Sequence, residues 1–74
     1  MVRTMEEATM VIDEIVGRCV RDLEYGKRVL DNPEVTLAEY DPCEGILDDF
    51  RALAKHREEA LDNWLTLRFI IHHQ

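Results

Sequence analysis

The chain has 74 residues, of which 46% are apolar and 34% are charged, and its formal net charge is −7. A chain of this length forms one domain at most, and this composition is too apolar for a disordered protein. The chain has 16 acidic and nine basic residues, and the basic residues form no run. The clustered positive charge of nucleic-acid-binding proteins is therefore missing from the sequence. We therefore expect a single domain over residues 1–74 that binds no nucleic acid directly.

The first predicted helix runs from about residue 5 to residue 31. Thr4 and Glu7 have the spacing of a capping box, in which side chains satisfy free backbone amides at a helix start. Asn32 ends the helix, because the residue before a proline avoids the helical region. The apolar residues form one wide stripe, which indicates contact with more than one neighbour. The stripe consists of Met5, Ile12, Val16, Cys19, Leu23 and Leu30.

The connection covers residues 32–41, and the capping-box pattern repeated at Thr36 and Glu39 allows a short helical turn within it. Asp41 then suits the N-cap of a second helix and Pro42 its first position, so this helix runs from about 42 to 72. Its apolar residues alternate spacings of four and three, which is the heptad spacing of a helix packed along another helix. The heptad positions are Ile46, Phe50, Leu53, Arg57, Ala60, Trp64, Leu67 and Ile71.

These elements predict an all-α fold, a two-helix antiparallel hairpin. A lone hairpin of this size has little against which to bury its apolar stripes. We therefore expect a second chain to complete it as a four-helix bundle, either by dimerisation or by a partner protein.

Apolar residues that fall outside the stripes mark the expected interface. Phe69 and Ile70 lie on the polar side of the second helix, while Met10 lies off the first stripe and Val11 on its shoulder. In a hairpin, the end of the second helix lies beside the start of the first. These residues and Ile71 would then make the open end of the hairpin apolar on several sides, as an interface requires.

Two arginines, Arg57 and Arg68, interrupt the apolar face of the second helix. A buried guanidinium keeps its proton and needs an anion. Each arginine therefore forms a structural ion pair, extends its head group into water, or binds an anion between helices. Trp64 lies at a heptad position, where it is either a core residue or an interface anchor, and in a dimer the two interpretations merge.

Residues typical of catalytic or metal sites are few. His56 and Glu59 share a helical face, but that face points to solvent, which indicates a surface pair rather than a metal site. Cys43 has acidic neighbours that oppose its ionisation, and no histidine is placed to activate it. We expect no catalytic residue, no cofactor and no metal ligand within one chain, and hence no enzyme.

The two cysteines, Cys19 and Cys43, are too far apart in a hairpin to form a disulfide, which favours a reducing compartment. No basic region followed by an apolar run begins the sequence, so we expect no signal peptide, and the longest apolar-rich stretch, residues 64–71, is too short to span a bilayer. We therefore expect a cytoplasmic protein that does not associate with membranes.

Three functions are compatible with this pattern. The first is a small non-catalytic interaction or regulatory protein, which acts as a helical-hairpin dimer or docks on a larger partner. The second is an acidic inhibitor, of phage type or mimicking nucleic acid, of a nucleic-acid-binding enzyme. It is motivated by the net charge and by an acidic cluster made of Asp41, Glu44, Asp48 and Asp49. The third is an anion or metal site at a dimer interface, built around the two arginines.

Overall fold

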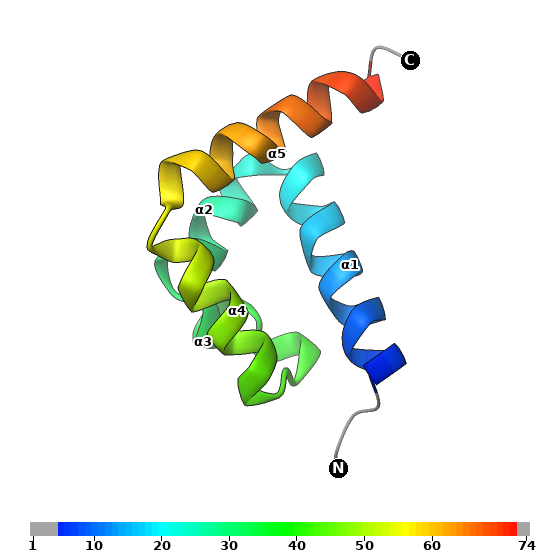
Figure 1. Ribbon diagram of the computed structural model, residues 1–74, viewed down its shortest axis with the longest axis vertical. Coiled ribbons are helices and arrows are strands. Elements are labelled where there is room, and N and C mark those ends of the chain that lie inside the picture. Colours follow the sequence, from blue (N-terminus) through cyan, green and yellow to red (C-terminus); the bar gives the residue numbers. More distant parts are fainter. Residues whose placement is uncertain (1–4, 73–74) are drawn as a thin grey trace.

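The computed structural model describes residues 5–72, and this part of the chain is all-helical, with no strand (Figure 1). The prediction of an all-α fold is confirmed. The described elements are α1 (Met5–Arg21), α2 (Leu23–Asp31), α3 (Pro33–Thr36), the 3₁₀ turn η1 (Ala38–Tyr40), α4 (Glu44–Ala54) and α5 (Arg57–His72).

The expected first helix is divided at Asp22. This residue has extended backbone angles, with φ −137° and ψ 96°. Its carboxylate accepts hydrogen bonds from the backbone amides of Glu24 (3.1 Å) and Tyr25 (3.3 Å). Aspartate is well suited to this position because its short side chain satisfies the free amides at a helix start. One helix over residues 5–31 is therefore corrected to two, α1 and α2, whose outer ends agree with the prediction.

The connection contains two short helical turns rather than one. Asn32 caps α3 by accepting a hydrogen bond from the backbone amide of Val35 (3.3 Å), and Pro33 is the first residue of this helix. Asp41 does not cap the next helix as expected. It ends η1 in the left-handed conformation, with φ 47°, which aspartate tolerates better than most residues. The N-cap of α4 is Cys43.

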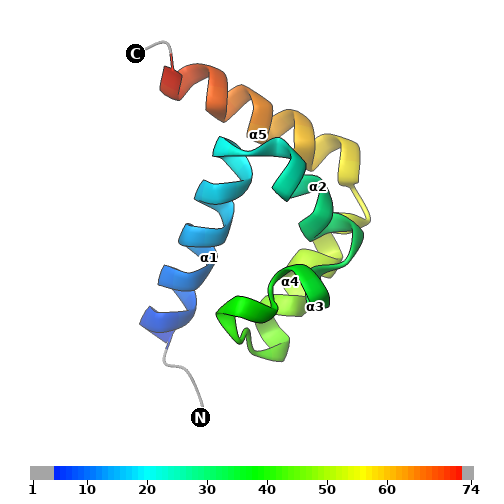
Figure 2. The ribbon, with the colours of Figure 1, turned by 180° about the vertical axis from the view of Figure 1, so that it is seen from behind.

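The expected second helix is divided at Lys55 and His56. The Lys55 amide donates to the carbonyl of Ala52 (3.2 Å), and the His56 amide donates to that of Leu53 (2.9 Å). These i to i−3 bonds tighten and end α4. Helix α5 then leaves in a different direction (Figures 1 and 2). One helix over residues 42–72 is therefore corrected to two, α4 and α5. The sequence does not reveal this break, because the heptad spacing continues through it without a glycine or a proline.

Helix α2 lies at the centre of the molecule and contacts α1, α3, α4 and α5. Helix α5 also packs on α1 and α4, and it bridges the two sides of the arch that Figure 2 shows. The bends let one chain surround a core, whereas two straight helices would have needed a second chain. The core consists of Ile15, Cys19, Val20, Tyr25, Val29, Leu30, Leu37, Ile46, Leu47, Phe50, Ala60 and Trp64.

Candidate interaction surface

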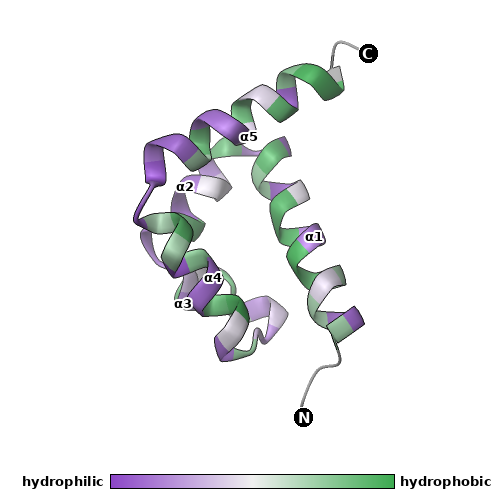
Figure 3. Cartoon of the chain, in the orientation of Figure 1, coloured by the Kyte–Doolittle hydropathy of each residue, from purple (hydrophilic) through white to green (hydrophobic). Residues whose placement is uncertain are grey.

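More exposed large apolar side chains lie in the last two turns of α5 than in any other described helix. Between 44% and 61% of each of five large apolar residues is exposed. They are Leu65, Leu67, Phe69, Ile70 and Ile71. Figure 3 shows this segment as a hydrophobic stretch that follows the hydrophilic start of the helix. We call residues 65–71 the α5 end.

The position of α5 on the other helices explains this exposure. Its first half lies over α2 and the last turn of α1, where Ala60 and Trp64 are buried. Its second half runs out beyond α1, as both ribbon views show (Figures 1 and 2). The apolar residues of the α5 end point in several directions around the helix. A helix that is apolar all round is normally buried, so the exposure of this segment is unusual for a folded chain.

The predicted interface residues are not all brought together. Met10 is exposed, but it lies in the half of α1 that points away from the α5 end (Figures 1 and 2). Val11 is partly buried and packs against the core. The open end of a hairpin, where these two residues would have joined Phe69, Ile70 and Ile71, is not formed because α1 and α5 diverge.

Trp64 lies in the core of the single chain. It is 5% exposed, and its ring faces Gly26, where an added Cβ would lie 3.0 Å from two ring carbons. Glycine is needed at this place because it lets α2 and α5 approach closely. Trp64 is therefore a core residue of the single chain. Its ring is not exposed to a second chain in this conformation.

The two arginines of α5 have different surroundings. The Arg57 Nε donates a hydrogen bond of 3.0 Å to Asp31 at the end of α2. This is the structural ion pair with the first half of the chain that we had considered. Arg68 is exposed, and it lines a groove together with Arg21 and Lys27.

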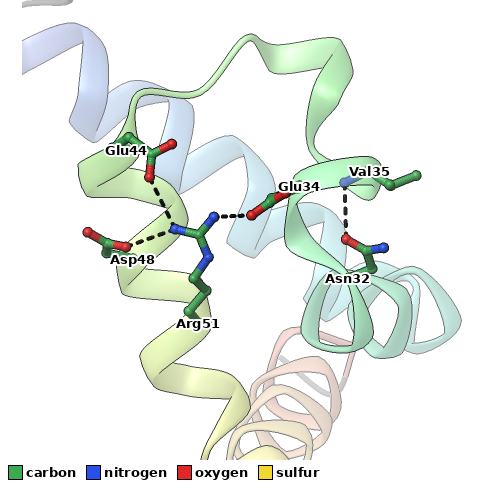
Figure 4. Close-up of polar contacts among 6 residues, drawn as sticks. All are labelled: Asn32, Glu34, Val35, Glu44, Asp48 and Arg51. Atoms are coloured by element: carbon green, nitrogen blue, oxygen red, sulfur yellow. Dashed lines mark hydrogen bonds and ion pairs between the residues drawn. The ribbon is translucent and has the colours of Figure 1, made fainter.

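The acidic cluster is partly neutralised by Arg51. Its guanidinium bonds Glu44 (3.2 Å) and Asp48 (2.8 Å) on its own helix and also Glu34 on α3 (Figure 4). These carboxylates raise the pKa of Arg51. Arg51 therefore ties α3 to α4, and it pairs with Glu44 and Asp48 of the expected acidic cluster.

A second polar cluster was not found from the sequence. The Arg18 Nη1 donates to Glu39 (2.7 Å) and to the Tyr40 hydroxyl (3.4 Å), and these bonds raise the pKa of Arg18. The same guanidinium lies 3.9 Å from the centre of the Tyr25 ring. This cluster joins α1 to the η1 turn. Its other members lie 7 to 22 residues from Arg18 in the chain, so no local pattern could have revealed it.

The titratable groups in the core are held neutral. Burial raises the pKa of the Cys19 thiol to about 11 and that of the Tyr25 hydroxyl to about 12. A thiol with this pKa is a poor nucleophile at neutral pH. Both cysteines are free, and Cys43 is exposed. Among the side chains of residues 5–71, no three histidine, cysteine, aspartate or glutamate residues lie close enough to share a metal ion.

No helix within the described range is both long enough and apolar enough to cross a membrane. Comparisons of the chain with protein-family models, with curated protein sequences and with solved structures found no match.

Proposed function

We propose that this protein is a non-catalytic protein–protein interaction protein and that the α5 end is its docking surface. The observation that carries this proposal is the exposure of five large apolar side chains within seven consecutive residues. Side chains of this size, each about half exposed, present on the order of several hundred Å² of apolar surface to water. Covering that surface stabilises an assembly by roughly 25 cal/mol per Å² before the costs of association are subtracted.

The charge distribution favours a second copy of the chain as the first partner to consider. At a net charge of −7, two copies repel each other over most orientations. The α5 end contains no acidic residue, and its only charged residue is Arg68. Two copies that meet at this end bury apolar surface with little repulsion. A homodimer is therefore the primary form of the proposal, and docking on a larger helical partner is the alternative.

The test is the mass of the assembly in solution. We expect the wild-type chain to change from 8.7 kDa to twice that mass as its concentration rises in sedimentation velocity. The double variant Phe69→Glu/Ile70→Glu should stay monomeric, because it places charges in the apolar contact. Val35→Glu is the matched control, since Val35 is an exposed apolar residue on α3.

A wild-type chain that stays at the monomer mass at every concentration would contradict self-association. Affinity capture from the native host, with the same double variant as the control, then tests the larger partner. Equal capture by the wild-type chain and the double variant would remove the α5 end as the docking surface.

The other two hypotheses have less support. An acidic inhibitor needs free carboxylates, and Glu44 and Asp48 of the acidic cluster are paired with Arg51. An anion or metal site built on both arginines is weakened by the pairing of Arg57 with Asp31. We retain the cytoplasm as the proposed compartment, a choice that the two free cysteines support.

A further inference from the structure

A groove of about 460 Å³ lies between α5 and the junction of α1 with α2. Its apolar residues are Leu23, Leu61 and Leu65, and two arginines, Arg21 and Arg68, come from its two sides. The volume falls within the range of ligand-binding clefts. The groove therefore combines an apolar surface with positive charge in a protein that is strongly acidic overall.

The two arginines of this groove form no ion pair with any residue between 5 and 72, although acids outnumber bases by 16 to 9 in the chain. Three of the other described arginines are paired: Arg18 with a glutamate, Arg51 with three carboxylates and Arg57 with an aspartate. Arg28 forms no ion pair with a described residue, but its guanidinium lies 5.8 Å from the centre of the Tyr25 ring. An exposed guanidinium left without a carboxylate is available to one from another molecule.

The carboxylates of the groove itself are mostly engaged. Asp22 caps α2 through two backbone amides. Glu24 accepts a hydrogen bond of 3.1 Å from Lys27. Asp62 is the remaining carboxylate on the groove wall. The groove is thus lined by two arginines and one aspartate that form no ion pair within the described range, which leaves an excess of positive charge. The groove therefore fits a segment that carries both an acidic and an apolar side chain.

The first two turns of α1 have this chemistry. Met5 and Met10 are 85% and 69% exposed. Together with Glu6 and Thr9 they line one shallow depression of about 450 Å³, so all four lie on one surface. Methionine side chains are flexible and adapt to apolar surfaces of varied shape. Residues 5–10 span about 7.5 Å along the helix axis, so they fit within the roughly 10 Å between residues 61 and 68 of the groove.

This segment cannot reach the groove of its own chain. Met5 and Arg21 lie at opposite ends of α1, which places them about 24 Å apart at 1.5 Å per residue. The matching segment therefore has to come from another molecule.

We propose that the groove binds the first two turns of α1 from a second copy of the chain. The Arg21 and Arg68 guanidinium groups donate hydrogen bonds to the Glu6 carboxylate of that copy, while its Met5 and Met10 side chains cover Leu61 and Leu65. This inference rests on the self-association proposed above. It adds a second contact, in which the start of α1 in one copy lies in the groove of the other.

Charge reversal tests this contact directly. Arg68→Glu and Glu6→Arg should each lower the association constant at least tenfold in sedimentation velocity at low ionic strength, where ion pairs are least screened. The two single variants mixed in equal amounts should associate with each other, because each supplies the complement of the other at both contacts. The double variant Glu6→Arg/Arg68→Glu should regain self-association for the same reason.

Lys55→Glu is the matched control for the change of charge, because Lys55 is exposed and lies outside this groove. All the substituted residues are exposed, and circular dichroism should show unchanged helix content. If Arg68→Glu associates like the Lys55→Glu control, which changes the net charge by the same amount, or if the mixture and the double variant show no rescue, this inference is overturned.

The two proposals can fail separately. Loss of association in Phe69→Glu/Ile70→Glu, without rescue between the charge variants, leaves the α5 end standing and removes the groove contact. A wild-type chain that is monomeric at every concentration overturns both self-association proposals.

Discussion

The two halves of α5 continue one heptad spacing but have opposite surroundings. Residues 57–64 lie over α2 and α1, where Ala60 and Trp64 are buried. The α5 end continues the same spacing through Leu67 and Ile71, and both of these residues are exposed. The comparison teaches that a heptad identifies the apolar face of a helix, whereas the path of the neighbouring helices decides which part of that face is covered.

The comparison is tested most strongly by truncating one residue on each side of the boundary. Trp64→Ala should lower the free energy of unfolding by about 3 to 5 kcal/mol, because it opens a cavity between α5 and α2. Leu65→Ala should lower it by less than about 1 kcal/mol, since Leu65 is 52% exposed. Urea unfolding at a concentration that favours the monomer measures both. Equal losses for the two variants would mean that the α5 end is also buried in the monomer.

The core beneath the first half of α5 also predicts a loss of stability at alkaline pH. The Cys19 pKa rises from 9.0 to about 11 because the thiol is buried. The folded state then keeps its proton when the unfolded chain has lost it. The stabilisation is complete below pH 9 and is lost as the pH rises to about 11. The loss amounts to about 2 to 3 kcal/mol in full.

Unfolding of the wild-type chain and of Cys19→Ala from pH 8 to 11, in the presence of a reductant, measures this effect. The wild-type chain should lose more stability over this range, because only its core contains the thiol. Parallel pH profiles would show that the thiol is accessible to water and that the core under α5 is less closed than described.

Two glycines sharpen the comparison because the same substitution should have opposite effects. Gly26→Ala should destabilise the fold by about 1 kcal/mol, since the added Cβ lies 3.0 Å from two carbons of the Trp64 ring. Gly17→Ala should stabilise it by about 0.5 to 1 kcal/mol. Its Cβ meets only the flexible guanidinium of Arg21, at 3.3 Å, and alanine favours the helix. Thermal unfolding of both variants checks the signs, and stabilisation by Gly26→Ala would contradict the close packing of α2 against Trp64.

The smallest expected effect concerns the ion pair at the start of α5. Arg57→Gln should cost about 0.2 to 1 kcal/mol, because the Arg57–Asp31 pair is largely open to solvent. Salt should reduce this cost. A double-mutant cycle with Asp31→Asn isolates the pair energy. Arg68→Gln is the comparison from the α5 end, and it should not change the stability of the monomer. A coupling energy of zero would leave packing alone to position α5.

Much of the fold was predictable because it rests on local chemistry. The proline signal at Asn32 placed the end of α2 correctly, and the connection contains helical turns, of which one was expected. Thr4, on which the capping signal of α1 depends, lies outside the described residues. The breaks were missed for two reasons. Asp22 is an N-cap residue inside an otherwise continuous stripe, and the break at Lys55 and His56 falls where the heptad spacing is uninterrupted.

The candidate surface was only partly predictable. The irregular positions of Phe69 and Ile70 in the heptad indicated an apolar helix end, and both are exposed. The separation of Met10 from that end, and the groove that joins Arg21 to Arg68, depend on the directions in which the helices leave each break. Those directions follow from contacts between distant residues.

By itself the sequence determined which segments are helical, which faces are apolar and where the acidic charge lies, because these properties depend on residues within a few turns of each other. The tertiary structure alone decided that the Trp64 ring packs against Gly26 of α2 and that the apolar side chains of the α5 end are exposed. The physical reason is that burial is a property of pairs of surfaces: an apolar face gains stability only where the rest of the chain can reach it.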